Sequence, residues 1–278
     1  MNTYSSARAA SAVIALVFSA FSAFAATPLL FPQPLHLTRA VDDPGGKTTV
    51  VDEYCRGNTV ISISGDRTVI ADYEKQTVTE IDRAAGTYSV TAFTELAKIA
   101  APAPQAMKAG DDAFTVRATG PRAAHAGAEY YEAEAKNART PLRKVETGVD
   151  RSVHLSRDAA EVLAGAAYPR SRSDESEILL RASAPDQGTR RVQSNAAGVN
   201  AQPQQQQEYG LAVDQTVTYQ MDGRTVVIRN RITHVGQEQP PAQSTEIPAG
   251  AHLVESAAVQ ALKELQAADR LPSAPSHK

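Results

Sequence analysis

Tryptophan is absent from this 278-residue sequence, and aromatic residues make up only 5% of it. Hydrophobic residues reach 42%, but alanine supplies much of that share. Aromatic side chains fill cores efficiently because each of them buries a large apolar surface. A core made from this composition must therefore be built from valine, isoleucine and leucine, with a few tyrosines.

Only one cysteine is present, Cys55, so no disulfide can form within the chain. Without a disulfide, the fold depends on its core alone. A cysteine that acts as a nucleophile or redox group needs a partner such as histidine, and none is near Cys55 in the sequence. We therefore expect Cys55 to be a small, buried core residue.

Neither sign of charge dominates, because the sequence has 28 lysines and arginines and 31 aspartates and glutamates. This balance gives no electrostatic reason to expect a nucleic acid or an anionic membrane as a partner. After the first 25 residues, no stretch approaches the ~20 apolar residues that span a bilayer. The sequence thus predicts no nucleic-acid partner and no integral membrane segment.

Catalytic and metal-binding motifs are lacking as well. There is no G-x-S-x-G motif, and the six histidines show none of the HxH, HxxxH or HExxH spacings. The stretch "GGKT" at 45–48 resembles the end of a phosphate-binding loop, but Val41 stands where the first glycine is needed. The sequence therefore predicts no enzyme, no metal site and no cofactor, and a zinc site assembled from distant residues has no support in the spacing.

The first 25 residues have the layout of a secretory signal peptide. Arg8 gives a positive start, "AVIALVFSAFSAFA" follows as an apolar run, and residues 23–25 have the small-x-small form before a cleavage point at Ala26. The alternative is an N-terminal membrane anchor. We expect an exported protein, periplasmic if the source is a Gram-negative bacterium.

The remaining chain divides by composition. Residues 26–46 carry several prolines and end in a Pro-Gly-Gly turn, so we expect an irregular segment. Residues 47–182 and 210–268 are expected to form one β-rich domain. Residues 183–209, rich in glutamine and asparagine, are expected to be a disordered insertion, and residues 269–278 a loose tail.

Short strands are predicted between residues 47 and 93, where turn signals recur at the spacing of an antiparallel meander. Apolar residues alternate with polar ones within each run. This alternation places Val69 with Tyr73, and Tyr88 with Val90, on the apolar face of the sheet.

A later hairpin has the strongest local signal. The Asp-Gly pair at 222–223 favours a two-residue type I′ turn. That turn sets Tyr219 opposite Val226 and Val217 opposite Ile228. We expect these apolar pairs to share one face of the sheet.

Helices are expected after Thr94, after the N-cap residue Ser156, and over residues 255–268. A meander of strands with a few helices fits a mainly β (α+β) fold. We expect one strongly curved antiparallel sheet or half-barrel, with the helices covering its concave face.

Two segments carry a resemblance to a known group of proteins. "DYEKQTVTEIDRAAGTYSV" (72–90) and "STEIPAGAHLV" (244–254) resemble elements of a group of bacterial envelope proteins. Those proteins resemble the outer-membrane lipoprotein carrier, an incompletely closed antiparallel barrel with helices on its concave side. The resemblance implies that fold, and it implies acyl-chain binding with a lipid or a lipidated protein as partner.

Two functions follow from these observations. The first is an exported soluble envelope protein that binds or carries an apolar (acyl) ligand on a concave sheet face. The second is a structural or protein-interaction module of the envelope with a filled core and no ligand. The residues that would line the cavity in the first case, and fill the core in the second, are Val69, Tyr73, Tyr88, Val90, Tyr219, Val226 and Ile228.

Overall fold

The computed structural model of the protein describes residues 28–100, 114–120, 127–136, 141–165, 174–184, 208–221, 223–260 and 263. The expected signal peptide, most of the expected insertion and the expected tail lie outside these ranges. No helix within the ranges is long and apolar enough to cross a membrane.

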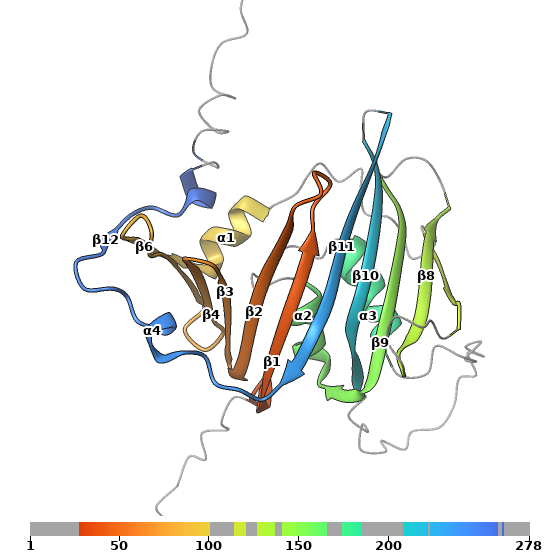
Figure 1. Ribbon diagram of the computed structural model, residues 1–278, viewed down its shortest axis with the longest axis horizontal. Coiled ribbons are helices and arrows are strands. Elements are labelled where there is room, and N and C mark those ends of the chain that lie inside the picture. Colours follow the sequence, from red (N-terminus) through yellow and green to blue (C-terminus); the bar gives the residue numbers. More distant parts are fainter. Residues whose placement is uncertain are drawn as a thin grey trace, which may run out of the picture.

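A single open sheet of 12 strands organises the described chain, in the order β12-β6-β5-β4-β3-β2-β1-β11-β10-β9-β8-β7 (Figure 1). The strands are β1 (Phe31–Asp42), β2 (Thr48–Gly57), β3 (Thr59–Ser64), β4 (Arg67–Asp72), β5 (Thr77–Asp82), β6 (Thr87–Ala92), β7 (Phe114–Ala118), β8 (Glu129–Ala135), β9 (Leu142–Leu155), β10 (Tyr209–Met221), β11 (Arg224–Gly236) and β12 (His252–Leu253). The helices are α1 (Phe93–Ala100), α2 (Arg157–Ala164), α3 (Asp174–Ser183) and α4 (Ala242–Thr245). The prediction of a mainly β fold built on one large sheet is confirmed.

The direction of one strand differs from the prediction. Neighbouring strands are antiparallel throughout, except that β12 pairs in parallel with β6. β12 arrives from the long C-terminal segment rather than from a hairpin, so its direction is not fixed by a tight turn. The sheet is therefore mixed.

The segment 26–46 is not irregular, because it contains the long strand β1. This strand lies at the centre of the sheet, paired with β2 on one side and β11 on the other. Its two prolines, Pro32 and Pro34, fall where the pairing with β2 is interrupted, between Phe31 and Leu35. Proline cannot donate a ladder hydrogen bond, so it is tolerated at such an interruption. The prolines mark the start of a strand here, not its absence.

The β10–β11 hairpin has the predicted register. Val217 pairs with Ile228 and Tyr219 pairs with Val226. Gly223 adopts a φ of 75°, the conformation that the expected turn requires. The short turn thus fixes which residues of the two long strands share a side of the sheet.

The helix after Ser156 also begins as predicted. Ser156 is extended, and its hydroxyl accepts a hydrogen bond from the backbone N–H of Ala159 at 3.1 Å. This bond satisfies one of the donors that a helix leaves free at its first turn. Helices α2 and α3 then pack against β9 and β10.

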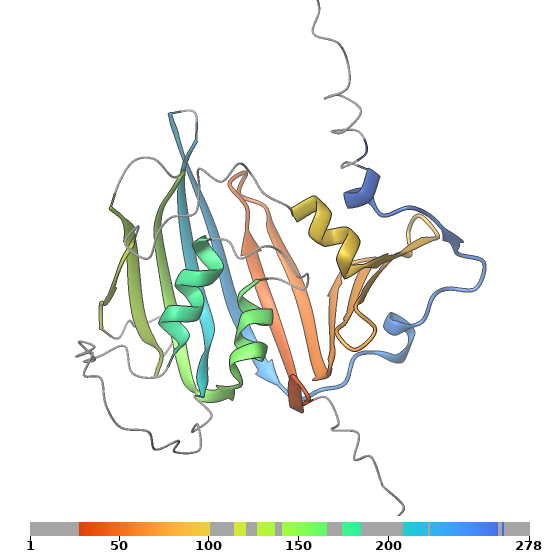
Figure 2. The ribbon, with the colours of Figure 1, turned by 180° about the vertical axis from the view of Figure 1, so that it is seen from behind.

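The three longer helices lie on the same side of the sheet (Figure 2). We call this the helix side, and the opposite surface the open side. In Figure 2, α1 lies over the short strands, α3 lies over the long ones, and α2 lies over the lower part of the central strands. The helices therefore cover two separate parts of the sheet.

Buried apolar residues form three clusters where the helices pack on the sheet. The largest packs α2 against the central strands and includes Leu37, Cys55 and Leu211, and the second packs α3 against β8–β10. The third is small and holds Ala71, Val78 and Phe93 beneath α1. Cys55 is buried as expected, and burial raises the pKa of its thiol to about 12. It therefore stays protonated near neutral pH.

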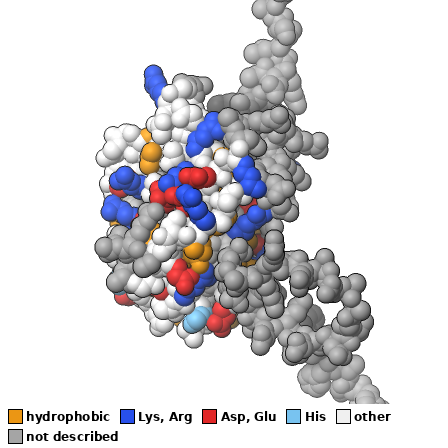
Figure 3. All heavy atoms as spheres, turned by 90° about the vertical axis from the view of Figure 1, so that its right-hand side faces the viewer, with side chains coloured by type: hydrophobic (Ala, Val, Ile, Leu, Met, Phe, Trp, Pro, Cys, Tyr) orange, Lys and Arg blue, Asp and Glu red, His pale blue; other side chains and the backbone are white. Residues whose placement is uncertain are grey.

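The end of the sheet at β7 and β8 is polar. Figure 3 looks onto this end and shows Lys and Arg side chains beside Asp and Glu, with few hydrophobic ones. Glu132 of β8 is at the centre of one group of charges. It forms an ion pair with Arg117 and another with Lys144, whose Nζ lies 2.6 Å from Glu132 Oε2. Charge pairs of this kind keep a sheet edge from joining another sheet.

Candidate functional site

The seven residues predicted to line a cavity do not share one side of the sheet. Five lie on the helix side and two lie on the open side. The pairing across the strands places Val69, Tyr73, Tyr219, Val226 and Ile228 on the helix side. It places Tyr88 and Val90 on the open side.

The prediction that Tyr88 and Val90 share a face with Val69 and Tyr73 is wrong, and Phe93 is the reason. Phe93 packs edge-on against Tyr73, with 5.3 Å between the ring centroids, and so fixes the start of α1 on the helix side. Strand alternation then brings Thr91 to the helix side, opposite the buried Val78. Val90 faces the other way and is 50% exposed.

An apolar strip remains on the helix side over the central strands. It consists of Val41, Val51, Val226 and Ile228, which are half-buried and belong to none of the three clusters. Val41 of β1 is diagonal to Ile228 of β11 and to Val51 of β2, so the side chains can meet across the strands. The strip is therefore continuous over the three central strands.

Polar groups border this strip. Arg39 Nε donates to Glu53 Oε2 at 2.5 Å, and both side chains are largely buried. Ser62, opposite Glu53, and Asn230, opposite Val41, each keep a buried side-chain oxygen that has no hydrogen-bond partner among the described residues. Such buried oxygens are rare unless water or a ligand satisfies them. The strip thus has an apolar surface with hydrogen-bonding groups beside it.

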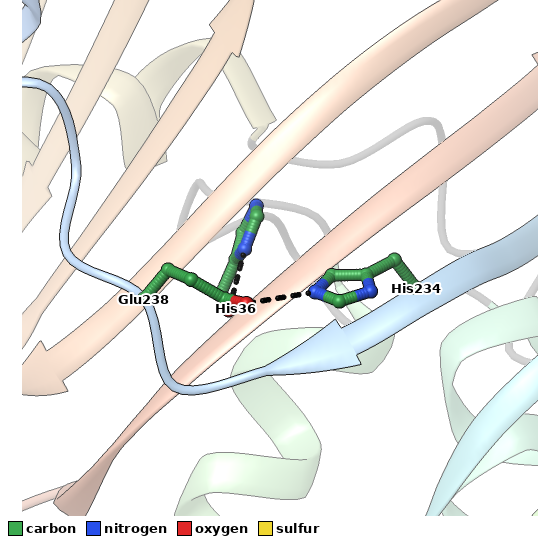
Figure 4. A group of neighbouring side chains, drawn as sticks. All are labelled: His36, His234 and Glu238. Atoms are coloured by element: carbon green, nitrogen blue, oxygen red, sulfur yellow. Dashed lines mark hydrogen bonds and ion pairs between the residues drawn. The ribbon is translucent and has the colours of Figure 1, made fainter.

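A second group of side chains lies on the open side, at the lower end of β1 and β11 (Figure 4). The carboxylate of Glu238 lies 3.0 Å from His36 Nδ1 and 3.2 Å from His234 Nε2. A hydrogen bond from the backbone N–H of Glu238 itself, together with its hydrogen bonds to His36 and His234, lowers the pKa of this carboxyl to about 2. Glu238 is therefore an anion at any ordinary pH.

Sequence reasoning did not bring these three residues together. His36 and Glu238 are 202 residues apart, so no short motif connects them. His36 and His234 form none of the short histidine spacings either. A correct prediction of the pairing between β1 and β11 would have brought the group together. That pairing was missed because residues 26–46, which contain β1, were expected to be irregular.

Comparisons with known proteins give a weak likeness only. A scan of the sequence against family models finds no match, and a search of curated protein sequences finds none either. Among solved structures, an outer membrane lipoprotein-sorting protein domain from Vibrio parahaemolyticus resembles the chain with a TM-score of 0.29 and 5% identity. That match covers 76% of this chain and 88% of the other. The resemblance to the lipoprotein-sorting domain is thus weak and partial.

A structure of PNGF-II also matches, with a TM-score of 0.35 and 8% identity. The match covers 84% of this chain but only 33% of PNGF-II. The chain thus spans about a third of the length of that protein.

Proposed function

We propose that the protein is an exported binding or carrier protein of the cell envelope, and that it takes the acyl chain of a lipid or lipidated protein on the apolar strip. The observation that carries this proposal is the strip itself. Its valine and isoleucine side chains are half-buried and lie outside all three clusters. In this proposal the helix side is the concave face of the sheet.

The energetics favour covering the strip. Apolar surface removed from water stabilises a complex by about 25 cal/mol per Å². An extended acyl chain could lie across β11, β1 and β2 between the helices and remove Ile228, Val41 and Val51 from water together. Three neighbouring strands offer a longer apolar contact than a single exposed side chain does.

The polar border supports an amphiphilic ligand. Buried oxygens of Ser62 and Asn230 lack partners among the described residues, and Arg39 is held beside them by Glu53. A ligand head group could satisfy those oxygens while its chain covers the strip, because a buried polar atom without a partner is costly. A purely hydrocarbon ligand would leave them unsatisfied.

The direct test is a melting experiment with palmitate. A ligand that binds only the folded state raises its stability by RT ln(1 + [L]/Kd), so the Tm should rise with palmitate concentration. Ile228→Glu should abolish the rise, since it places a charge in the strip. The matched control is Val50→Glu, which adds the same charge on the open side of β2, where Val50 is already 53% exposed. A Tm that does not respond to palmitate, or responds equally in both variants, would falsify the proposal.

One observation favours the alternative, a protein-interaction module. Two apolar residues are exposed on the open side where β12 pairs with β6, namely Val90 at 50% and Leu253 at 65%. Exposed apolar patches often mark interaction sites. If no acyl ligand raises the Tm, this edge becomes the better candidate for the functional site, as a surface for protein interaction.

A further inference from the structure

The spacing of His36, His234 and Glu238 suits a metal ion. One ligand atom from each residue can be chosen so that all three lie within 4.8 Å of one another. The carboxylate of Glu238 is 3.0 Å from His36 and 3.2 Å from His234. A tetrahedral zinc ion with bonds of about 2.0–2.1 Å holds neighbouring ligand atoms about 3.3 Å apart. The first distance is to Glu238 Oε2 and the second is to Oε1, so each oxygen lies close to the zinc-site spacing from one histidine nitrogen.

A β-bulge brings His234 to the open side. Ile232 pairs with Arg39 and His234 pairs with Thr38, so Thr233 is an extra residue in β11. In a regular strand, His234 would lie on the same side as Ile232, which is buried on the helix side. The extra residue turns His234 to the other side, where His36 lies, and bulges commonly re-aim a side chain in this way.

The ring of His36 is held in a fixed orientation. It stacks on Tyr54, with 4.2 Å between centroids and 5° between the planes. Its Nε2 lies 3.3 Å from Asp52 Oδ1, and that oxygen also accepts a hydrogen bond from Thr38 Oγ1 at 2.7 Å. Both ring nitrogens of His36 thus face carboxylates, Asp52 on one side and Glu238 on the other.

Carboxylates on both sides of one imidazole favour a cation at this place. A protonated His36 would donate to both of them, whereas the neutral ring donates from one nitrogen and presents a lone pair at the other. A metal ion on Nδ1 would use that lone pair, and Nε2–H would donate to Asp52. In protein metal sites, a ligating histidine usually donates from its other ring nitrogen to a carboxylate, a backbone carbonyl or water.

The backbone next to the group leaves room for it. A Cβ atom at Gly236 would lie 2.7 Å from both Glu238 Cδ and His234 Nε2, which is too close for a real side chain. Glycine at this position therefore leaves free the space where the side chains of Glu238 and His234 meet. The requirement is one of space, since Gly236 is not among the glycines with positive φ.

We propose that His36, His234 and Glu238 form a binding site for a divalent transition-metal ion, with Zn²⁺ as the best fit, and that Asp52 orients His36. Two imidazoles and one carboxylate are a recurring zinc donor set that leaves a fourth position for water. That position is accessible, because the side chains of His234 and Glu238 are 48% and 55% exposed. A pocket of about 160 Å³, lined in part by Thr233, His234 and Val235, adjoins the site.

Direct titration of the untagged, chelator-treated protein with Zn²⁺ tests the site, with Co²⁺ absorption as a second readout. We expect one equivalent of Zn²⁺ to bind, and a Co²⁺ complex with the intense visible bands of a four- or five-coordinate ion. Asp52→Asn should weaken Zn²⁺ binding about 10–100-fold. His234→Ala removes a ligand and should weaken it further.

Two more variants make the test specific. His154→Ala removes a histidine that is also paired with a glutamate, since His154 Nδ1 lies 2.9 Å from Glu208 Oε2, but lies outside the group. This variant should bind Zn²⁺ as the wild type does. Gly236→Ala keeps every ligand yet should weaken binding by displacing Glu238 and His234. The proposal is overturned if no stoichiometric Zn²⁺ binds the wild type, or if His154→Ala and His234→Ala bind it with equal affinity.

The metal site and the acyl strip can fail separately. They lie on opposite sides of the sheet, and the tests use different ligands and different variants. Loss of the palmitate response would leave the Zn²⁺ result unaffected, and the reverse also holds.

Discussion

Leu37 and Arg39 of β1 face the helices, whereas His36 and Thr38 of the same strand face away from them. On the helix side, the helices pack on the sheet through buried apolar residues and a buried ion pair is present, while the open side holds the histidine group and more exposed ion pairs. Alternate residues of one strand thus serve two different surfaces. The difference teaches that a single extra residue, such as the bulge at Thr233, can move a side chain from one surface to the other.

The largest expected effect comes from an ion pair on each side. Arg39→Met should lower the free energy of unfolding by about 3–5 kcal/mol, because it leaves Glu53 charged and largely buried without its partner. The control is Arg231→Met on the open side, where Arg231 is 48% exposed and binds Asp42 at 3.1 Å. That change should cost at most about 1 kcal/mol. Urea unfolding measures the loss of unfolding free energy in both variants. Equal losses would contradict the difference proposed between the two sides of the sheet.

An apolar pair of variants gives the next effect. Leu37 is fully buried on the helix side, so Leu37→Ala should cost about 2–5 kcal/mol through lost burial and the cavity left behind. Val50, on the open side of the neighbouring strand, is 53% exposed, and Val50→Ala should change stability by no more than about 0.5 kcal/mol. Urea midpoints that shift by the same amount would show that Leu37 is not part of a packed core.

The turn between β10 and β11 gives a smaller effect. Gly223→Val should cost about 1–3 kcal/mol, because a β-branched residue resists the φ of 75° found there. Nothing lies within 4 Å of a Cβ at this position, so the cost is one of backbone conformation and not of collision. Gly223→Asn is the matched control and should melt closer to the wild type, since asparagine tolerates positive φ. Similar melting temperatures for both variants would contradict the assigned turn.

The smallest expected effect is a pH dependence on the open side. Hydrogen bonds from Lys144 and then Arg117 lower the pKa of Glu132 below its usual value of 4.5. A lowered pKa contributes stability above the unfolded-state value, and that contribution is lost as pH falls through the folded-state value. The free energy of unfolding should therefore fall as pH drops below 4.5, and Glu132→Gln should make the fall shallower. Urea unfolding across this pH range gives the free energy of unfolding of both proteins. If it changes with pH by the same amount in the variant and the wild type, Glu132 does not cause the pH dependence.

Features set by neighbours in the sequence could be predicted. The cap at Ser156 depends on a bond three residues away, and the register of Tyr219 with Val226 depends on a two-residue turn between their strands. The burial of Cys55 followed from its residue type and the lack of a nearby histidine partner. Local rules suffice wherever the deciding contact is local.

Features set by distant contacts could not be predicted. The side that Val90 faces depends on Phe93 packing against Tyr73 from another strand. The histidine group depends on the pairing of β1 with β11 and on the bulge between them. Neither leaves a periodic signal in the sequence, because the residues that meet are far apart along the chain.

Solvent extraction of the purified protein, followed by lipid mass spectrometry, tests the central claim most directly. The apolar strip should retain an acyl lipid from the host, at about one molecule per chain for a single filled site. The Ile228→Glu protein, purified in parallel, should yield little or none, while Val50→Glu should match the wild type. Absence of any acyl lipid from the wild type, or equal amounts from wild type and Ile228→Glu, would contradict the assignment of the helix side as a ligand-binding surface.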